Sequence, residues 1–122
     1  MILFAHGARD ARWSASVQSL ALAIQARLGA GTVRAAFLEI QSPRLPQALE
    51  SAAADGARHI DIVPIFWAGA GHIDRDLPPM MDAFAQRHPE VAVRALPVLS
   101  ELPGMMEFIA GVIAQLAQEP RS

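Results

Sequence analysis

The chain has 122 residues, a formal net charge of −2 and no cysteine; 52% of its residues are hydrophobic and 18% are charged. This length suits one domain, the apolar content can fill a packed core, and the charge argues against nonspecific binding to nucleic acid. All ten basic residues are arginine, and tyrosine is absent as well. These absences exclude disulfides, thiolate metal sites, a P-loop lysine and Schiff-base chemistry, so a metal site would have to use His, Asp, Glu, backbone oxygen or water.

Short apolar runs alternate with amphipathic stretches in the first half of the chain. This pattern predicts a strand, a helix, a strand and a helix, in that order, over residues 2–5, 10–28, 32–38 and 42–56. Ser42 and Pro43 are typical of the N-cap and first turn of the second helix. Gly56 is typical of a residue that ends a helix.

The second half of the chain continues the alternation. It predicts a strand, a helix, a strand and a helix, over residues 60–66, 76–88, 91–96 and 100–118. A glycine-rich loop at residues 67–72 joins the first two of these elements. Pro64 has no backbone N–H, so we expect it late in its strand or at a place where one hydrogen bond between strands is missing. We expect residues 1–118 to form a single domain and residues 119–122 to be a flexible tail.

Strands that are separated by helices need crossover connections, and these produce a parallel sheet with both faces covered. The expected fold is therefore an α/β three-layer sandwich of the flavodoxin-like kind, with a four-stranded parallel sheet in the order 2-1-3-4 and helices on both faces. No apolar run approaches the roughly 20 residues that span a bilayer, and the N-terminal residues lack the basic region of a signal peptide. We therefore expect a cytoplasmic protein that does not enter a membrane.

Two histidines follow strands that are neighbours in this order. His6 follows the first strand, and His72 lies in the loop after the third. Ligands of such sheets bind beyond the carboxyl ends of the strands, where the connections diverge to opposite faces. Two neutral imidazoles there can bind a divalent transition metal or accept protons near pH 7. A histidine at a strand end can also be only a structural hydrogen-bonding group, and the pattern leaves both interpretations open.

Charged residues of both signs are expected at the same edge of the sheet. Glu39 follows the second strand, where its carboxylate can bind a metal or relay a proton. Four arginines lie in loops or first helical turns on this rim and favour a polyanionic ligand: Arg9, Arg12, Arg44 and Arg75. We expect structural roles for His59, at the opposite edge, and for His88, at the C-terminal end of a helix.

Five short motifs follow one another along the chain: His6-Gly7-Ala8-Arg9-Asp10, Ala36-Phe37-Leu38-Glu39, Val63-Pro64-Ile65-Phe66, Gly71-His72 and Asp76-Leu77-Pro78. Together they resemble the small CbiX and SirB type of class II tetrapyrrole chelatases, and the resemblance covers nearly the whole chain. Two positions depart from the family pattern. Ala8 stands where Ser is usual, and Ala70 stands where Gly is common.

The resemblance implies a chelatase-like α/β fold and the insertion of Co²⁺ or Fe²⁺ into sirohydrochlorin, in cobalamin or sirohaem biosynthesis respectively. It implies that His6 and His72 bind the metal and accept protons, with Glu39 as a further catalytic residue. The metal is a substrate, no organic cofactor is implied, and Ni²⁺ would also suit these ligands. The rim arginines would meet the carboxylates of the macrocycle, and Trp67 would form a wall of its crevice.

The resemblance further implies a homodimer, because the short members of the family match half of the longer chelatases. Phe108 and Val112 widen the apolar stripe of the last helix, which also favours a partner. Two other functions stay open. One is a noncatalytic module that binds metal or tetrapyrrole on the same fold. The other is a histidine phosphatase that uses His6, although Ala5 stands where such an enzyme needs an arginine.

Overall fold

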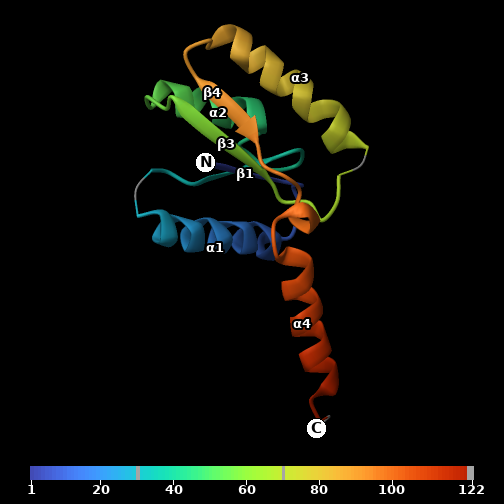
Figure 1. The fold of residues 1–122 in the computed structure, drawn as a ribbon. Coiled ribbons are helices and arrows are strands. Elements are labelled where there is room, and N and C mark those ends of the chain that lie inside the picture. Colours follow the sequence, from blue (N-terminus) through green and yellow to red (C-terminus); the bar gives the residue numbers. More distant parts are fainter. Residues whose placement is uncertain (30, 70, 121–122) are drawn as a thin grey trace.

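The computed structural model describes residues 1–29, 31–69 and 71–120, and it describes the backbone of His72 without its side chain. In this part of the chain the strands are β1 (Ile2–Ala5), β2 (Arg34–Phe37), β3 (His59–Pro64) and β4 (Ala92–Ala95). The helices are α1 (Ala11–Leu28), α2 (Leu45–Ala54), α3 (His72–Arg87), a short 3₁₀ helix η1 (Leu99–Glu101), and α4 (Met105–Gln118) (Figure 1).

The strands form one parallel sheet in the order β2-β1-β3-β4, which confirms the predicted topology. β1 lies in the middle, where Ile2 pairs with Arg34 of β2 on one side and with Ile62 of β3 on the other. All four residues of β1 are buried and apolar, as expected for a strand covered on both faces. The carboxyl ends of β1, β2 and β3 therefore meet at one edge of the sheet.

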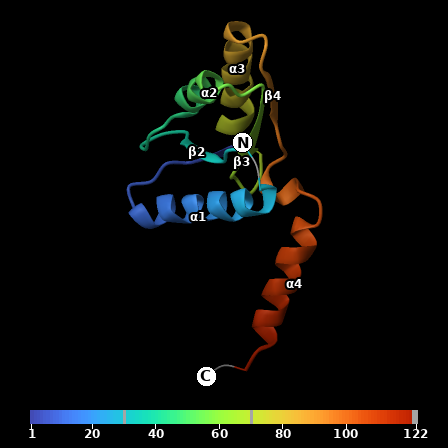
Figure 2. The ribbon, with the colours of Figure 1, turned by 90° about the vertical axis from the view of Figure 1, so that its left-hand side faces the viewer.

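Helices cover the two faces of the sheet unequally (Figures 1 and 2). α2 and α3 lie on one face, and the core between them and the strands includes Phe4, Leu49, Ile62 and Phe84. On the opposite face α1 packs Val17 and Ala21 against the sheet. α1 contacts β1 and β2, so it covers one half of this face.

α4 does not cover the sheet of its own chain. Figures 1 and 2 show it extending away from the other elements, and none of its residues is buried. The prediction of one continuous helix over residues 100–118 is wrong, because this stretch is divided into η1 and α4. Gly104, the N-cap of α4, has a φ of 79°. This left-handed conformation separates η1 from α4. α4 ends at Gln118, and residues 121 and 122 of the predicted tail lie outside the described residues.

The second helix begins later than predicted. Arg44, rather than Ser42, occupies the N-cap of α2, and its backbone N–H donates to Gln47 Oε1 at 3.0 Å. The Ser42–Pro43 peptide is cis, and the Pro43 carbonyl accepts a hydrogen bond from the N–H of Phe37 at 2.9 Å. Residues 42–44 therefore run beside the end of β2 and do not form the first turn of the helix.

The third helix begins one turn earlier than predicted, at His72 instead of near Asp76. Ile73 and Leu77 are both buried, so the apolar face of α3 starts before the predicted start of the helix. Pro64 is the last residue of β3, as predicted. Among the residues that the structure describes, no helix has the length and apolar character needed to cross a membrane.

Candidate functional site

His6 follows β1 directly and lies at the carboxyl edge of the sheet with its side chain exposed. Its ring stands edge-on to that of Phe66, with the ring centroids 4.5 Å apart and the planes at 80°. The indole Nε1–H of Trp13 donates a hydrogen bond to the His6 carbonyl at 2.5 Å. The backbone of His6 is thus fixed by α1, and its imidazole rests on an aromatic side chain while it stays open to solvent.

Gly7 brings the loop after β2 into contact with the loop after β1. A Cβ atom at Gly7 would lie 1.6 Å from the carbonyl oxygen of Glu39, a separation that only glycine allows. The N–H of Leu38 donates to the Ala5 carbonyl at 2.9 Å, which continues the β1–β2 pairing up to this point. Glu39 is exposed, so the structure places its residue at the same edge as His6, as the sequence predicted.

Gln41 holds the same two loops together, and the sequence analysis missed it. Its side-chain Oε1 accepts a hydrogen bond from the backbone N–H of Ala8 at 2.9 Å. A glutamine in a loop belongs to no periodic pattern or motif, so no signal in the sequence singles it out. The contact shows that Ala8, which replaces the usual Ser of the family pattern, contributes its backbone here.

The backbone of the loop after β3 is hydrogen-bonded to β1 and to η1. Ile65 donates its N–H to the Phe4 carbonyl at 2.7 Å, and the Phe66 carbonyl accepts from Leu99 of η1 at 2.9 Å. The Trp67 carbonyl likewise accepts from the N–H of Ser100 at 2.9 Å. The side chain of Trp67 is 49% exposed and is therefore available to a ligand at this edge.

The predicted pairing of His6 with His72 stays a prediction. His72 is the first residue of α3 and follows Gly71, so its backbone lies beyond the carboxyl end of β3. Its side chain lies outside the described residues, as does Ala70. Within the described residues, no group of three or more His, Asp or Glu side chains is arranged to hold a metal ion.

The four predicted rim arginines all follow the carboxyl ends of strands and are all exposed, but their side chains are engaged to different degrees. Arg12 lies in the first turn of α1, with its Nη2 atom 2.7 Å from Asp10 Oδ2. Hydrogen bonds from the Arg12 side chain and backbone hold the pKa of the Asp10 carboxyl below its usual range. Arg44 Nη1 donates to the Leu38 carbonyl at 3.4 Å. Arg9 lies in the loop after β1, and Arg75 lies in the first turn of α3.

A cavity of about 570 Å³ opens between α3 and the carboxyl end of β4. Its volume is in the range of small-molecule sites. Among its lining residues are three acidic ones, Asp74, Asp82 and Glu101. These carboxylates would repel a polyanionic ligand, so the cavity does not suit the ligand that the rim arginines favour.

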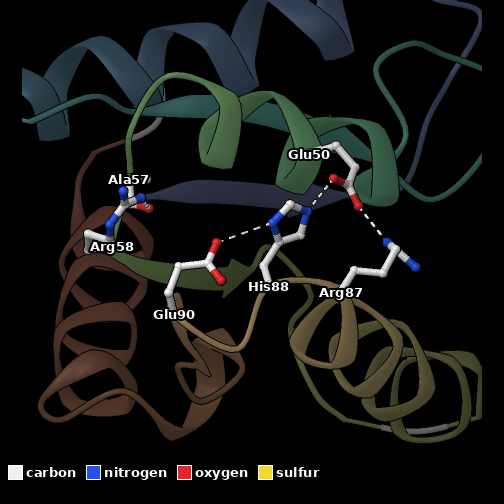
Figure 3. A network of polar contacts seen from close by, with 6 residues as sticks. All are labelled: Glu50, Ala57, Arg58, Arg87, His88 and Glu90. Atoms are coloured by element: carbon white, nitrogen blue, oxygen red, sulfur yellow. Dashed lines mark hydrogen bonds and ion pairs between the residues drawn. The ribbon is translucent and has the colours of Figure 1, made fainter.

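His88 follows the last residue of α3, and its contacts are with side chains that hold the fold together (Figure 3). Its Nε2 atom lies 2.6 Å from Glu50 Oε2 of α2, and its Nδ1 atom lies 3.5 Å from Glu90 Oε1. Its ring also stacks on that of Phe84, with the centroids 4.8 Å apart. His88 caps the C-terminal end of α3, as predicted, and the contact with Glu50, which the sequence did not predict, links α3 to α2.

Comparisons with known proteins show to which family the chain is similar. Residues 1–116 match the model of the CbiX family. The chain is 30% identical to the sirohydrochlorin cobaltochelatase of Methanocaldococcus jannaschii over 88 residues, and this alignment covers 72% of this chain and 62% of that protein. It is 27% identical to the sirohydrochlorin ferrochelatase of Bacillus subtilis, also over 88 residues, and this alignment covers 72% of this chain and 34% of that protein.

One solved structure shares the fold of this chain over nearly the whole length of both chains. The CbiX protein of Marinobacter aquaeolei superposes with a TM-score of 0.79 at 26% identity, covering 96% of this chain and 95% of that one. The chain thus matches nearly all of that solved chain, whereas it spans less than two thirds of the two chelatase relatives.

Proposed function

Because the chain belongs to the CbiX family, we propose that it is a sirohydrochlorin chelatase that inserts Co²⁺ or Fe²⁺ into the macrocycle in cobalamin or sirohaem biosynthesis. The relatives named sirohydrochlorin cobaltochelatase and ferrochelatase support this class of reaction. The observation that carries the proposal is the exposed imidazole of His6 beyond the carboxyl end of β1, against Phe66 and beside the loop of Glu39.

Metal insertion exchanges one divalent ion for the two pyrrole N–H protons of the macrocycle. The protein therefore has to hold a metal weakly enough to release it, and it has to accept protons. A neutral imidazole can do both, because its ordinary pKa lies near neutral pH. We assign metal delivery and proton acceptance to His6 and His72, and we assign to the exposed Glu39 the transfer of protons from this edge to solvent.

The remaining residues of the edge suit the macrocycle itself. Guanidinium groups bind carboxylates with two parallel hydrogen bonds, so the rim arginines would hold the carboxylates of sirohydrochlorin. Arg9 and Arg75 are the most available, since Arg12 already pairs with Asp10. The half-exposed Trp67 offers an apolar face to the flat ring. Imidazole and carboxylate ligands accept Co²⁺, Fe²⁺ and Ni²⁺, so we assign no single metal.

We also propose that the protein works as a homodimer. Its alignment with the B. subtilis relative spans only 34% of that protein. The apolar side chains of α4, including Phe108 and Val112, are exposed in the single chain. A second copy would remove this apolar surface from water.

The direct test is metal insertion in vitro. Sirohydrochlorin is mixed with Co²⁺, Ni²⁺ or, without oxygen, Fe²⁺, and the loss of the free macrocycle's absorption is followed with and without protein. We expect the protein to accelerate the reaction by at least about tenfold with Co²⁺ or Fe²⁺, a barrier decrease of about 1.4 kcal/mol. A protein that binds the macrocycle but accelerates insertion of no metal would be a carrier and would overturn the enzyme proposal.

A further inference from the structure

Ile40 combines a strained backbone with an exposed apolar side chain. Its φ is 71°, and among the residues that the structure describes it is the one residue other than glycine with a positive φ. A branched Cβ atom disfavours this conformation, so the surrounding contacts have to maintain it. The side chain is 54% exposed, so burial in the core does not explain why an isoleucine occupies this position.

The strained conformation belongs to a tight turn that is centred on Ile40. The N–H of Gln41 donates a hydrogen bond to the Glu39 carbonyl at 2.8 Å, so the bond closes a turn of three residues. Such a bond around a central φ of about 75° is the rare, strained form of the γ-turn. Glycine adopts a positive φ without this strain. The stability of the turn alone would therefore favour glycine over isoleucine.

Contacts with the loop after β1 hold the turn in place. The Gln41 side chain accepts a hydrogen bond from the N–H of Ala8 at 2.9 Å. The Glu39 carbonyl lies where a Cβ atom of Gly7 would be, so it has no room to move further toward that loop. The turn is thus fixed on both sides of Ile40. Backbone strain that is maintained in this way concentrates at sites that bind ligands or carry out chemistry.

The strand order places Ile40 and Trp67 on opposite sides of His6. β1 lies between β2 and β3; Ile40 is in the loop after β2, His6 follows β1 directly, and Trp67 is in the loop after β3. Trp67 is 49% exposed, which is close to the exposure of Ile40. The imidazole that we assign to metal delivery therefore has a partly exposed apolar side chain on each side along this edge of the sheet.

An arginine lies at the end of the same loop. Arg44 is exposed, and its Nη1 atom donates to the Leu38 carbonyl at 3.4 Å. A guanidinium group has five N–H donors, so donors remain for a carboxylate. The loop after β2 thus offers an apolar side chain and a cation within a few residues of each other. This combination suits a flat apolar ring with carboxylates at its periphery.

Given the function proposed above, on which this inference rests, we propose that Ile40 is a substrate-binding residue. Its side chain packs against the macrocycle on the β2 side of His6, opposite Trp67, and the γ-turn holds it there before the macrocycle arrives. Binding then does not have to order this loop. An apolar contact of this kind stabilises the bound substrate and the transition state equally, so Ile40 should affect the KM for the macrocycle and not kcat.

Ile40→Gly separates binding of the macrocycle from stability. Glycine accepts the positive φ and removes the side chain, so the melting temperature should equal or exceed that of the wild-type protein. The KM for sirohydrochlorin should rise about fivefold to tenfold, with kcat changed by less than about twofold. Ile40→Asn should raise KM in the same way, because asparagine also tolerates a positive φ but is polar.

Two control variants keep either the apolar contact or the edge intact. Ile40→Leu keeps an apolar side chain at the turn, so its KM should stay within about twofold of the wild-type value. Leu28→Ala removes a side chain that is 50% exposed at the C-terminal end of α1, away from the carboxyl edge of the sheet. It should leave the KM for the macrocycle unchanged.

A titration with sirohydrochlorin and no metal distinguishes failure of this proposal from failure of the proposed function. The change in absorption of the macrocycle gives its Kd, which should rise in Ile40→Gly by the same factor as KM. Wild-type affinity in both Ile40→Gly and Ile40→Asn would overturn the role of Ile40 and leave the chelatase proposal standing. A wild-type protein that binds no macrocycle would overturn the chelatase proposal itself, and the role of Ile40 with it.

Discussion

Gly7 approaches the carbonyl of Glu39 so closely that the two residues join the loops after β1 and β2 through their backbones. A Cβ atom at position 7 would come within 1.6 Å of that oxygen. The contact lies directly after His6, so the position of the imidazole relative to the second loop depends on a residue with no side chain. Replacement of this residue tests how much the site depends on the fit of the two loops.

Gly7→Ala should separate the loops and reduce both stability and metal insertion. The added methyl group cannot be accommodated without a shift of the Glu39 backbone, and overpacking of this kind costs about 1 to 3 kcal/mol of unfolding free energy. Urea unfolding and the insertion assay measure the two effects. Gly111→Ala is the matched control, because a Cβ atom there meets no atom within 4 Å, and it should cause no loss in either measurement. Equal behaviour of the two variants would contradict the role of Gly7.

His6→Ala should remove activity without unfolding the protein. His6 is exposed, so its removal should change the unfolding free energy by no more than about 0.5 kcal/mol. Loss of a group that transfers protons in the transition state lowers rates by about 10² to 10⁴-fold. His59→Ala is the control, because His59 is also exposed but begins β3 at the opposite edge of the sheet. Wild-type rates in His6→Ala would remove this residue from the site.

The proposed pairing of His6 with His72 makes a separate prediction about the double variant. Residues that act as a unit in catalysis have strongly non-additive effects. We therefore expect His72→Ala to lower the insertion rate as His6→Ala does, and the variant that lacks both to be little slower than either one. Rate losses that multiply would instead indicate that the two histidines act independently.

Glu50 should make stability depend on pH in acid. Hydrogen bonds from His88 and then from Arg87 hold the pKa of its carboxyl below its usual range. The folded-state pKa is lower than the unfolded one, so this stabilisation is present above about pH 4.3 and is lost as the pH falls through the folded value. Glu50→Gln should therefore lose less stability than wild type between pH 6 and pH 3, as measured by thermal unfolding. Glu107→Gln, on the exposed α4, should keep the wild-type slope; an unchanged slope in Glu50→Gln would refute the prediction.

The topology could be predicted from the sequence because alternating strands and helices leave few arrangements of a parallel sheet. The same topology explains why Glu39 was correctly placed at the edge of His6. The direction in which α4 leaves the sheet could not be predicted. An apolar stripe on a helix favours burial of that side, but it does not identify the surface against which the helix packs. Gln41 and the close approach of Gly7 to Glu39 were also missed, because both contacts depend on loop conformations that carry no periodic signal.

The helix boundaries differed for more local reasons. The first turn of α3 was left out of the predicted helix, although Ile73 and Leu77 continue the apolar face of the helix. Ser42 and Pro43 are typical of a helix N-terminus, but in the structure residues 43 and 44 pair with Phe37 at the end of β2. In both cases a tertiary contact outweighed a local preference.

The carboxyl edge of the sheet is held together mainly by its main chain: Leu38 to Ala5, Ile65 to Phe4, Leu99 to Phe66 and Ser100 to Trp67. Hydrogen bonds of this kind survive when side chains are exchanged, because every residue other than proline can supply them. The edge can therefore keep its shape while its exposed side chains are altered. That separation makes this small domain a suitable framework for redesigning metal preference, with the exposed positions around His6 as the ones to vary.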